Sequence, residues 1–193
     1  MKKTEKILAA ISILGILLSL NLIPYGGTLS IISMTCLAIL YMYLSFALFN
    51  DIPIKGIFKK DSYTKISKLR VFGTIVTGLV LSVSIIGILF KSQLYPYSSI
   101  LLAEGVIGLF IAAIVAFVQL KRSKDKFYFN ILKRIVIIGI LSIIFYLIPR
   151  EKILEISYRN HPEYVEAIKK AWTNPDNMAL WDKVYEESLK IHK

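Results

Sequence analysis

The sequence predicts an all-α membrane protein with five transmembrane helices, built on two tandem helical hairpins and followed by a small soluble helical hairpin. Of its 193 residues, 55% are hydrophobic and 19% are charged, against about 25% charged in soluble domains. The apolar residues fall in long runs, and a run of about 18 or more predicts a membrane span. Basic residues are concentrated in the segments between alternate runs.

The predicted spans cover residues 7–23, 29–49, 71–90, 100–120 and 135–148. They assign residues 1–149 to a transmembrane domain and residues 150–193 to a soluble C-terminal segment. The first span follows lysines, as in a signal peptide, but it is longer than the usual apolar region of about 7–15 residues and no A-x-A-like site follows. We therefore expect it to remain uncleaved.

The last predicted span is the shortest. Its 14 residues reach about 21 Å as a helix, against an apolar bilayer core of about 30 Å. Snorkelling of Lys133 and Arg134 would let preceding apolar residues extend it. A half-buried interfacial helix is the alternative.

The distribution of basic residues predicts the orientation. Fifteen lie in the N-terminus and in the 50–70 and 121–134 loops, whereas the two other loops contain only Lys91. By the positive-inside rule, the N-terminus and both basic loops face the cytoplasm of a bacterial inner membrane and the C-terminal tail lies outside. The net charge of +11 thus indicates the lipid bilayer as a partner, and not nucleic acid.

An internal repeat is visible at an offset of 72 residues. Nine of the eighteen positions from Ser12 to Leu29 are identical to those from Ser84 to Leu101, including a Pro-Tyr pair. We interpret residues 7–49 and 79–120 as two copies of one hairpin, related by an axis along the membrane normal. Convergent turn chemistry in an apolar background is the alternative.

Small residues recur at four-residue spacing in two predicted spans. Such faces let membrane helices approach closely, and we expect helix packing at Thr74, Gly78 and Ser82 and at Gly108, Ala112 and Ala116.

Two ionisable residues are candidates for function. Glu104 is the only acidic residue within a predicted span, where carboxylates often carry protons or bind cations. Lys91 is the one basic residue of the outer loops. The alternative is that Glu104 snorkels to the nearby outer boundary or pairs with Lys91.

No catalytic or cofactor-binding motif is present. The chain has no H-E-x-x-H, G-x-S-x-G or phosphate-loop sequence, and it has a single cysteine, Cys36, within a span. We therefore expect no catalytic residues, no metal site and no cofactor.

The C-terminal segment predicts two amphipathic helices, the first beginning at Pro162, with a turn over residues 173–177. A hairpin of this size is marginal on its own, so we expect it to dock on a partner or on the membrane. Trp172 and Trp181 are the docking candidates; they serve either the hairpin's own core or a ligand-binding box.

The second outer turn resembles that of the L subunit of the gliding-motility and type IX secretion motor. That family has G-x-L-F-K-x-x-H-W-P-G between two helices, and Gly87, Leu89, Phe90, Lys91 and Pro96 match in register. Tyr95 keeps an aromatic residue, and the segment from Gly15 to Pro24 matches more faintly, with Ser19 in place of the lysine.

The sequence differs from the family at the residues that carry the family's proton-motor chemistry. Leu94 replaces the histidine, Tyr97 replaces the glycine, and the region around Ala113 is apolar where the family has its key glutamate. The family's long cytoplasmic domain has no counterpart here. The resemblance implies a shared hairpin scaffold without the proton-motor residues, in which only Lys91 carries over.

Three functions remain open. The first is a non-enzymatic subunit or accessory of an envelope complex, with a membrane-protein partner or as a homo-oligomer. The second is a small ion-coupled transporter that uses Glu104 and Lys91. The third, a membrane-embedded enzyme, would need a polar, water-filled site, and the polar residues of the spans are scattered.

Overall fold

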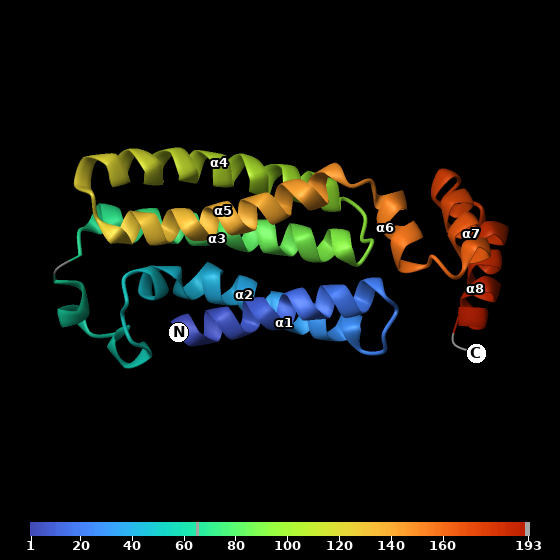
Figure 1. Cartoon of the computed structure of the whole chain (residues 1–193), viewed down its shortest axis with the longest axis horizontal. Coiled ribbons are helices and arrows are strands. Elements are labelled where there is room, and N and C mark those ends of the chain that lie inside the picture. The colour runs from blue at the N-terminus through green and yellow to red at the C-terminus, as the bar shows by residue number, and fades with distance from the viewer. Residues whose placement is uncertain (65, 192–193) are drawn as a thin grey trace.

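The computed structural model describes residues 1–64 and 66–191, which form an elongated helical bundle with a helical cap across one end (Figure 1). The described residues contain eight α-helices and two short 3-10 turns, and they contain no strand. In chain order these are α1 (Lys2–Leu20), α2 (Gly26–Phe49), η1 (Ile54–Gly56), η2 (Lys60–Tyr63), α3 (Lys68–Ser92), α4 (Ser98–Ser123), α5 (Lys126–Leu147), α6 (Arg150–Ser157), α7 (Pro162–Thr173) and α8 (Met178–Ile191).

The prediction of an all-α protein with membrane-spanning helices is confirmed, and four of the five predicted spans are among the helices that could cross. Four helices, α2 to α5, are long and apolar enough to cross a membrane. The helix that differs is α1, because every 18-residue stretch of its 19 residues includes at least three of Lys2, Lys3, Glu5 and Lys6. It nevertheless packs antiparallel along α2, with its charged first turn at the end of the bundle where α2 ends (Figure 1).

The helix predicted over residues 135–148 is longer than expected and is one of the four. It begins at Lys126, because the side chain of Asp125 caps it by accepting a hydrogen bond from the Phe127 backbone N–H at 2.8 Å. The additional residues include Lys133 and Arg134. They bring α5 to 22 residues, or about 33 Å of helix.

The turn between α1 and α2 and the turn between α3 and α4, which we call the outer turns, follow the same backbone path. Leu22 and Leu94 have φ values of 53° and 60°, and Tyr25 and Tyr97 have values of 66° and 60°. This left-handed conformation is uncommon for residues other than glycine. At the 72-residue offset the helix ends coincide as well, since α1 and α3 end at Leu20 and Ser92, and α2 and α4 begin at Gly26 and Ser98.

The closest approach between helices α2 and α3 is at Gly78. A Cβ atom there would collide with the Ser45 side chain and the Tyr41 carbonyl. Thr74 and Ser82 on the same face of α3 are fully buried. The small side chains on this face therefore set the spacing of α2 and α3.

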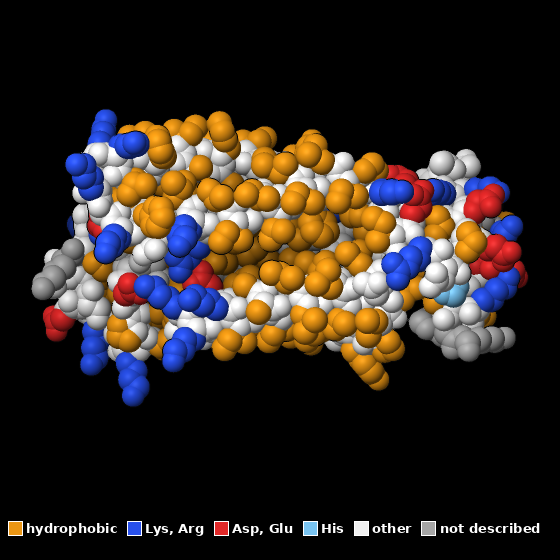
Figure 2. Space-filling model, in the orientation of Figure 1, with side chains coloured by type: hydrophobic (Ala, Val, Ile, Leu, Met, Phe, Trp, Pro, Cys, Tyr) orange, Lys and Arg blue, Asp and Glu red, His pale blue; other side chains and the backbone are white. Residues whose placement is uncertain are grey.

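The corresponding face of α4 packs on α3. Gly108 lies against Val80, Ala112 is half-buried and Ala116 is buried. Gly105 on α4 also packs closely on α3, because a Cβ atom there would collide with the Ser84 side chain. Apolar side chains cover the flanks of the bundle, and lysine and arginine gather at the end where α1 begins (Figure 2).

Helices α6 to α8 form the cap. Leu154, Val165 and Ile168 build its small core, and Leu94 from the outer turn between α3 and α4 packs against it. The Arg159 side chain also donates a hydrogen bond to Asn21 at 3.2 Å. Both outer turns therefore contact the cap.

Gly78 and Gly73 offer a matched test of packing. We expect Gly78→Ala to destabilise the protein by about 1–3 kcal/mol, because the added methyl overpacks the α2–α3 contact. Gly73→Ala adds the same methyl where nothing lies within 4 Å, and alanine has the higher helix propensity, so its melting temperature should equal or exceed that of the unaltered protein. Equal melting temperatures for both variants in detergent would contradict close packing at Gly78.

Candidate functional site

The two ionisable residues singled out by sequence lie at the outer end of the bundle but do not pair. Lys91 is buried, with 2% of its surface exposed, and its Nζ donates a hydrogen bond to Ser99 Oγ at 2.8 Å. Glu104 is exposed on α4, beside Tyr97 and Leu101 in a shallow apolar pocket. No ion pair joins them in the described part of the chain. Lys91 therefore braces the second outer turn, and Glu104 faces the surroundings.

A polar cluster that joins three helices lies elsewhere in the bundle, at Glu5, Tyr41 and Arg134. The Arg134 guanidinium donates two hydrogen bonds to the Glu5 carboxylate, from Nε to Oε1 at 2.5 Å and from Nη2 to Oε2 at 2.7 Å. The Tyr41 hydroxyl donates to Oε1 at 2.6 Å. Glu5 and Tyr41 are 7% and 3% exposed. Such bidentate, charge-assisted bonds are the strong ones in proteins.

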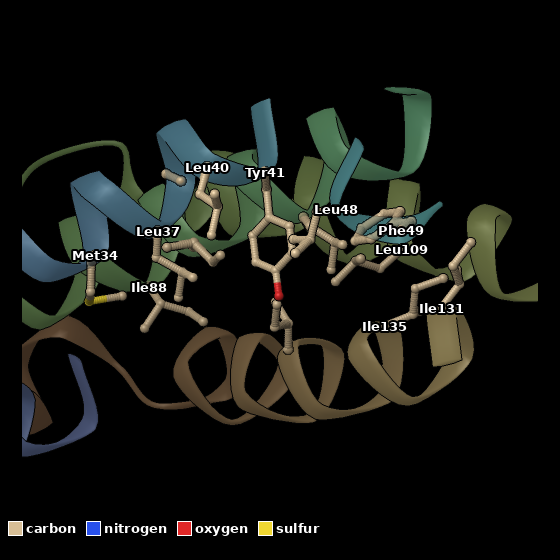
Figure 3. Packing of buried hydrophobic residues seen from close by; sticks show 14 of the residues in the cluster. Met34, Leu37, Leu40, Tyr41, Leu48, Phe49, Ile88, Leu109, Ile131 and Ile135 are labelled. Carbon is tan, nitrogen blue, oxygen red and sulfur yellow. The ribbon is translucent and has the colours of Figure 1, made fainter. Parts of the chain in front are cut away.

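Three different helices position this cluster. Glu5 sits in the first turn of α1, where the helix dipole favours a negative charge. The Tyr41 ring projects from α2 into the core, and its hydroxyl points toward the helix that carries Ile131 and Ile135 (Figure 3). Arg134 is held on α5 by a further bond from Nη1 to the Asn130 carbonyl at 3.1 Å.

Sequence reasoning missed this cluster for two reasons. Glu5 lay just before the predicted first span, and Arg134 just before the predicted last one, so both were assigned to loops. The two residues are also 129 positions apart, and no local pattern joins them. An available signal was Glu5 itself, the single acidic residue among three lysines at the N-terminus.

The cluster holds three helices together, and we call Glu5, Tyr41 and Arg134 the polar lock. The carboxylate accepts three hydrogen bonds, and the arginine keeps its charge under all physiological conditions. The Glu5–Arg134 pair joins the first and fifth helices, which otherwise are separated by a groove lined by α1, α2, α3 and α5.

A second polar cluster ties the basic loops together. The Arg70 side chain donates from Nε to Asn50 Oδ1 at 2.8 Å and from Nη1 to Asp125 Oδ2 at 3.0 Å. Its guanidinium carbon lies 3.5 Å from the centre of the Phe127 ring. This one arginine holds together the end of α2 and the starts of α3 and α5.

At the outer end, Gln93 joins the two hairpins. Its Nε2 donates to Ser30 Oγ at 3.0 Å and lies 3.5 Å from Ser19 Oγ. Ser19 occupies the position that corresponds to Lys91 at the 72-residue offset. At this position the first outer turn has the Ser19 hydroxyl, and the second has the Lys91 ammonium group.

The two tryptophans of the cap differ in their surroundings. Trp172 packs against the core of the cap beneath the Arg150 guanidinium, which lies 3.7 Å from the ring centre. Trp181 is exposed on α8 and donates from Nε1 to the Pro175 carbonyl at 2.9 Å. Within the same cap, burial and the neighbouring Tyr158 raise the pKa of Tyr164 to about 12. The structure does not bring the two tryptophans together as one box.

Helix α8 leaves an apolar face uncovered. None of its residues, Met178 to Ile191, is buried. Its exposed apolar side chains recur at helical spacing as Met178, Trp181, Tyr185 and Leu189, and we call this set the α8 stripe. Exposed large apolar patches mark sites of protein or membrane contact.

No protein-family model, curated protein or solved structure matches this chain. Among the described residues, no group of three or more histidine, cysteine, aspartate and glutamate side chains is placed to hold a metal ion.

The Glu5–Arg134 lock can be tested by a mutant cycle. Either Glu5→Leu or Arg134→Leu leaves the partner charge largely buried and unpaired, which costs about 3 kcal/mol. For a protein of this size we expect the melting temperature in detergent to fall by roughly 6–12 °C.

The double variant Glu5→Leu/Arg134→Leu should recover most of that loss, because replacing a whole buried pair by apolar residues is often neutral. If the double variant lost as much as the two single variants added together, the pair would not act as a unit.

Proposed function

We propose that this chain is a multi-pass protein of the bacterial cytoplasmic membrane in which α1 crosses together with α2 to α5. Its N-terminus and both basic loops then lie in the cytoplasm, and its C-terminal cap lies outside. The clustering of lysine and arginine at one end of the bundle supports this orientation (Figure 2). The opposite end has Lys91, which is buried, and a tail whose eight basic and eight acidic residues balance.

We also infer that residues 7–49 and 79–120 are a duplicated hairpin within a transmembrane domain of residues 1–149. Support comes from the coincident helix ends and from the paired left-handed residues of the two turns. Left-handed tyrosine at both Tyr25 and Tyr97 is costly, by about 1–2 kcal/mol each, and its recurrence at one offset favours common descent over chance.

As to activity, we propose a non-enzymatic accessory subunit of an envelope complex. The observation that carries this proposal is the uncovered α8 stripe, on a cap that is anchored to both outer turns. The polar clusters within the bundle support it too, because Arg134, Arg70 and Lys91 are each engaged in holding helices together.

The resemblance to the motor L subunit is compatible with such a role. Lys91, which carries over, is used here to brace a turn through Ser99. Tyr97 takes a left-handed conformation at the position where the family has glycine. Ala113, where the family has its glutamate, packs against the apolar core.

The docking role is tested by purifying the tagged chain from native membranes in mild detergent and identifying what stays bound. We expect a stoichiometric envelope protein to co-purify with the unaltered chain and to be lost from Tyr185→Ser/Leu189→Ser. These side chains are 65% and 50% exposed, so the fold should survive.

The control variant Asp182→Ala/Glu186→Ala alters exposed polar residues of the same helix and should keep the partner. Recovery of the unaltered chain alone, as a defined oligomer, would contradict the accessory role. Glu104→Gln and Lys91→Gln would then be the first variants to assay for ion-coupled transport.

The orientation is tested by cysteine labelling. In a Cys36→Ser background, we expect Ser188→Cys to react with a membrane-impermeant maleimide in intact cells and Lys59→Cys to react only after permeabilisation. The reverse pattern would place the cap in the cytoplasm.

A further inference from the structure

The groove between α1 and α5 has the form of a binding site. It has a volume of about 660 Å³, within the range of about 300–1,000 Å³ that is common for small-molecule pockets. Its floor is formed by buried residues of α2 and α3, including Met34, Leu37 and Ile88, and its walls by more exposed residues of α1 and α5. The hollow is visible along the apolar flank of the bundle in Figure 2.

The groove is divided into a charged end and an apolar length. Lys2, Glu5, Lys6, Asn130, Lys133 and Arg134 line the end near the basic loops. Beyond them the walls are apolar, with Ile13 and Leu17 on one side and Ile137 and Leu141 on the other. A ligand that fits must therefore be amphipathic.

Two lysines at that end of the groove have positive charges that no acidic residue of the described chain balances. Arg134 is neutralised by Glu5, and Lys2 pairs with Asp51. Lys6 and Lys133 are exposed, and within residues 1–64 and 66–191 neither has an acidic partner at ion-pair distance. The two are complementary to an anionic group beside the lock.

We propose that this groove binds one phospholipid with an anionic headgroup, its phosphate held by Lys6 and Lys133 and an acyl chain lying between α1 and α5. The dimensions agree, because one leaflet of the apolar core is about 15 Å thick, the rise of ten helical residues. That length reaches from Lys6 to Ile16, along the apolar part of the α1 wall. A lipid of the surrounding bilayer can enter sideways, since the walls are open.

This inference is independent of the accessory role, which depends on the opposite end of the molecule. The proposed orientation decides only which leaflet supplies the lipid, namely the cytoplasmic one.

The test is native mass spectrometry of the full chain in neutral detergent, titrated with dioleoylphosphatidylglycerol or dioleoylphosphatidylcholine. We expect one phosphatidylglycerol to bind more tightly than phosphatidylcholine. Lys6→Gln/Lys133→Gln should weaken phosphatidylglycerol roughly 25-fold, about five-fold for each lysine. Lys59→Gln/Lys60→Gln, which removes the same charge from a loop outside the groove, should leave binding unchanged.

A second pair of variants tests the apolar length. Ala9 lines the groove, whereas its neighbour Ala10 is exposed and does not. Ala9→Phe should abolish the single bound lipid, and Ala10→Phe should retain it, with gel filtration confirming that both fold. The exposed lysine variants keep the proposal testable if Ala9→Phe fails to fold.

Three outcomes would overturn the proposal. An equal loss of phosphatidylglycerol binding in Lys59→Gln/Lys60→Gln would mean that diffuse surface charge, and not the groove, attracts the lipid. Competition by inorganic phosphate at the affinity of the lipid would mean an anion site without an acyl chain. A stoichiometric polypeptide released by Ala9→Phe would mean that the groove receives a partner helix.

Discussion

The pairing of Glu5 with Arg134 is the interaction that closes the bundle. Helices α1 to α4 follow one another as antiparallel neighbours, each joined to the next by a short turn or loop. Helix α5 returns beside α3 and α4, and this ion pair, with Tyr41 beside it, links it to α1 across the groove. A charge at this depth is tolerated because its partner and its hydrogen bonds are complete.

The sequence was sufficient for the fold class and for the helix ends that turn chemistry defines. The Pro-Tyr turns and the long apolar runs are local signals, and they placed α2, α3 and α4 within a few residues. The first predicted span is not among the four helices that qualify, because α1 combines an apolar length with a charged first turn. The start of α5 was missed because Lys133 and Arg134 resemble loop residues until their partners, Phe129 and Glu5, are known.

The candidate site was less predictable than the fold. Glu104 and Lys91 stood out because each is rare in its stretch of sequence, and rarity is a local property. Glu5, Tyr41 and Arg134 form a site only through packing that joins distant segments. At the 72-residue offset of the proposed repeat, Glu5 and Tyr41 correspond to Thr77 and Ala113, so the second copy has no counterpart of the two residues that pair with Arg134 of α5. The two halves of the proposed repeat therefore differ in their interiors.

The order of synthesis gives the lock a consequence for assembly. Glu5 leaves the ribosome 129 residues before Arg134, and domains generally fold from the N-terminus as they emerge. During that interval the carboxylate has Tyr41 as a donor but lacks its cation. Helix α5 brings its three basic residues, Lys126, Lys133 and Arg134, to the bundle last, and Arg134 then pairs with the Glu5 carboxylate. The side of the bundle between α1 and α5 is thus the last to form during biogenesis. Lipid on this side is displaced or retained when α5 packs in place.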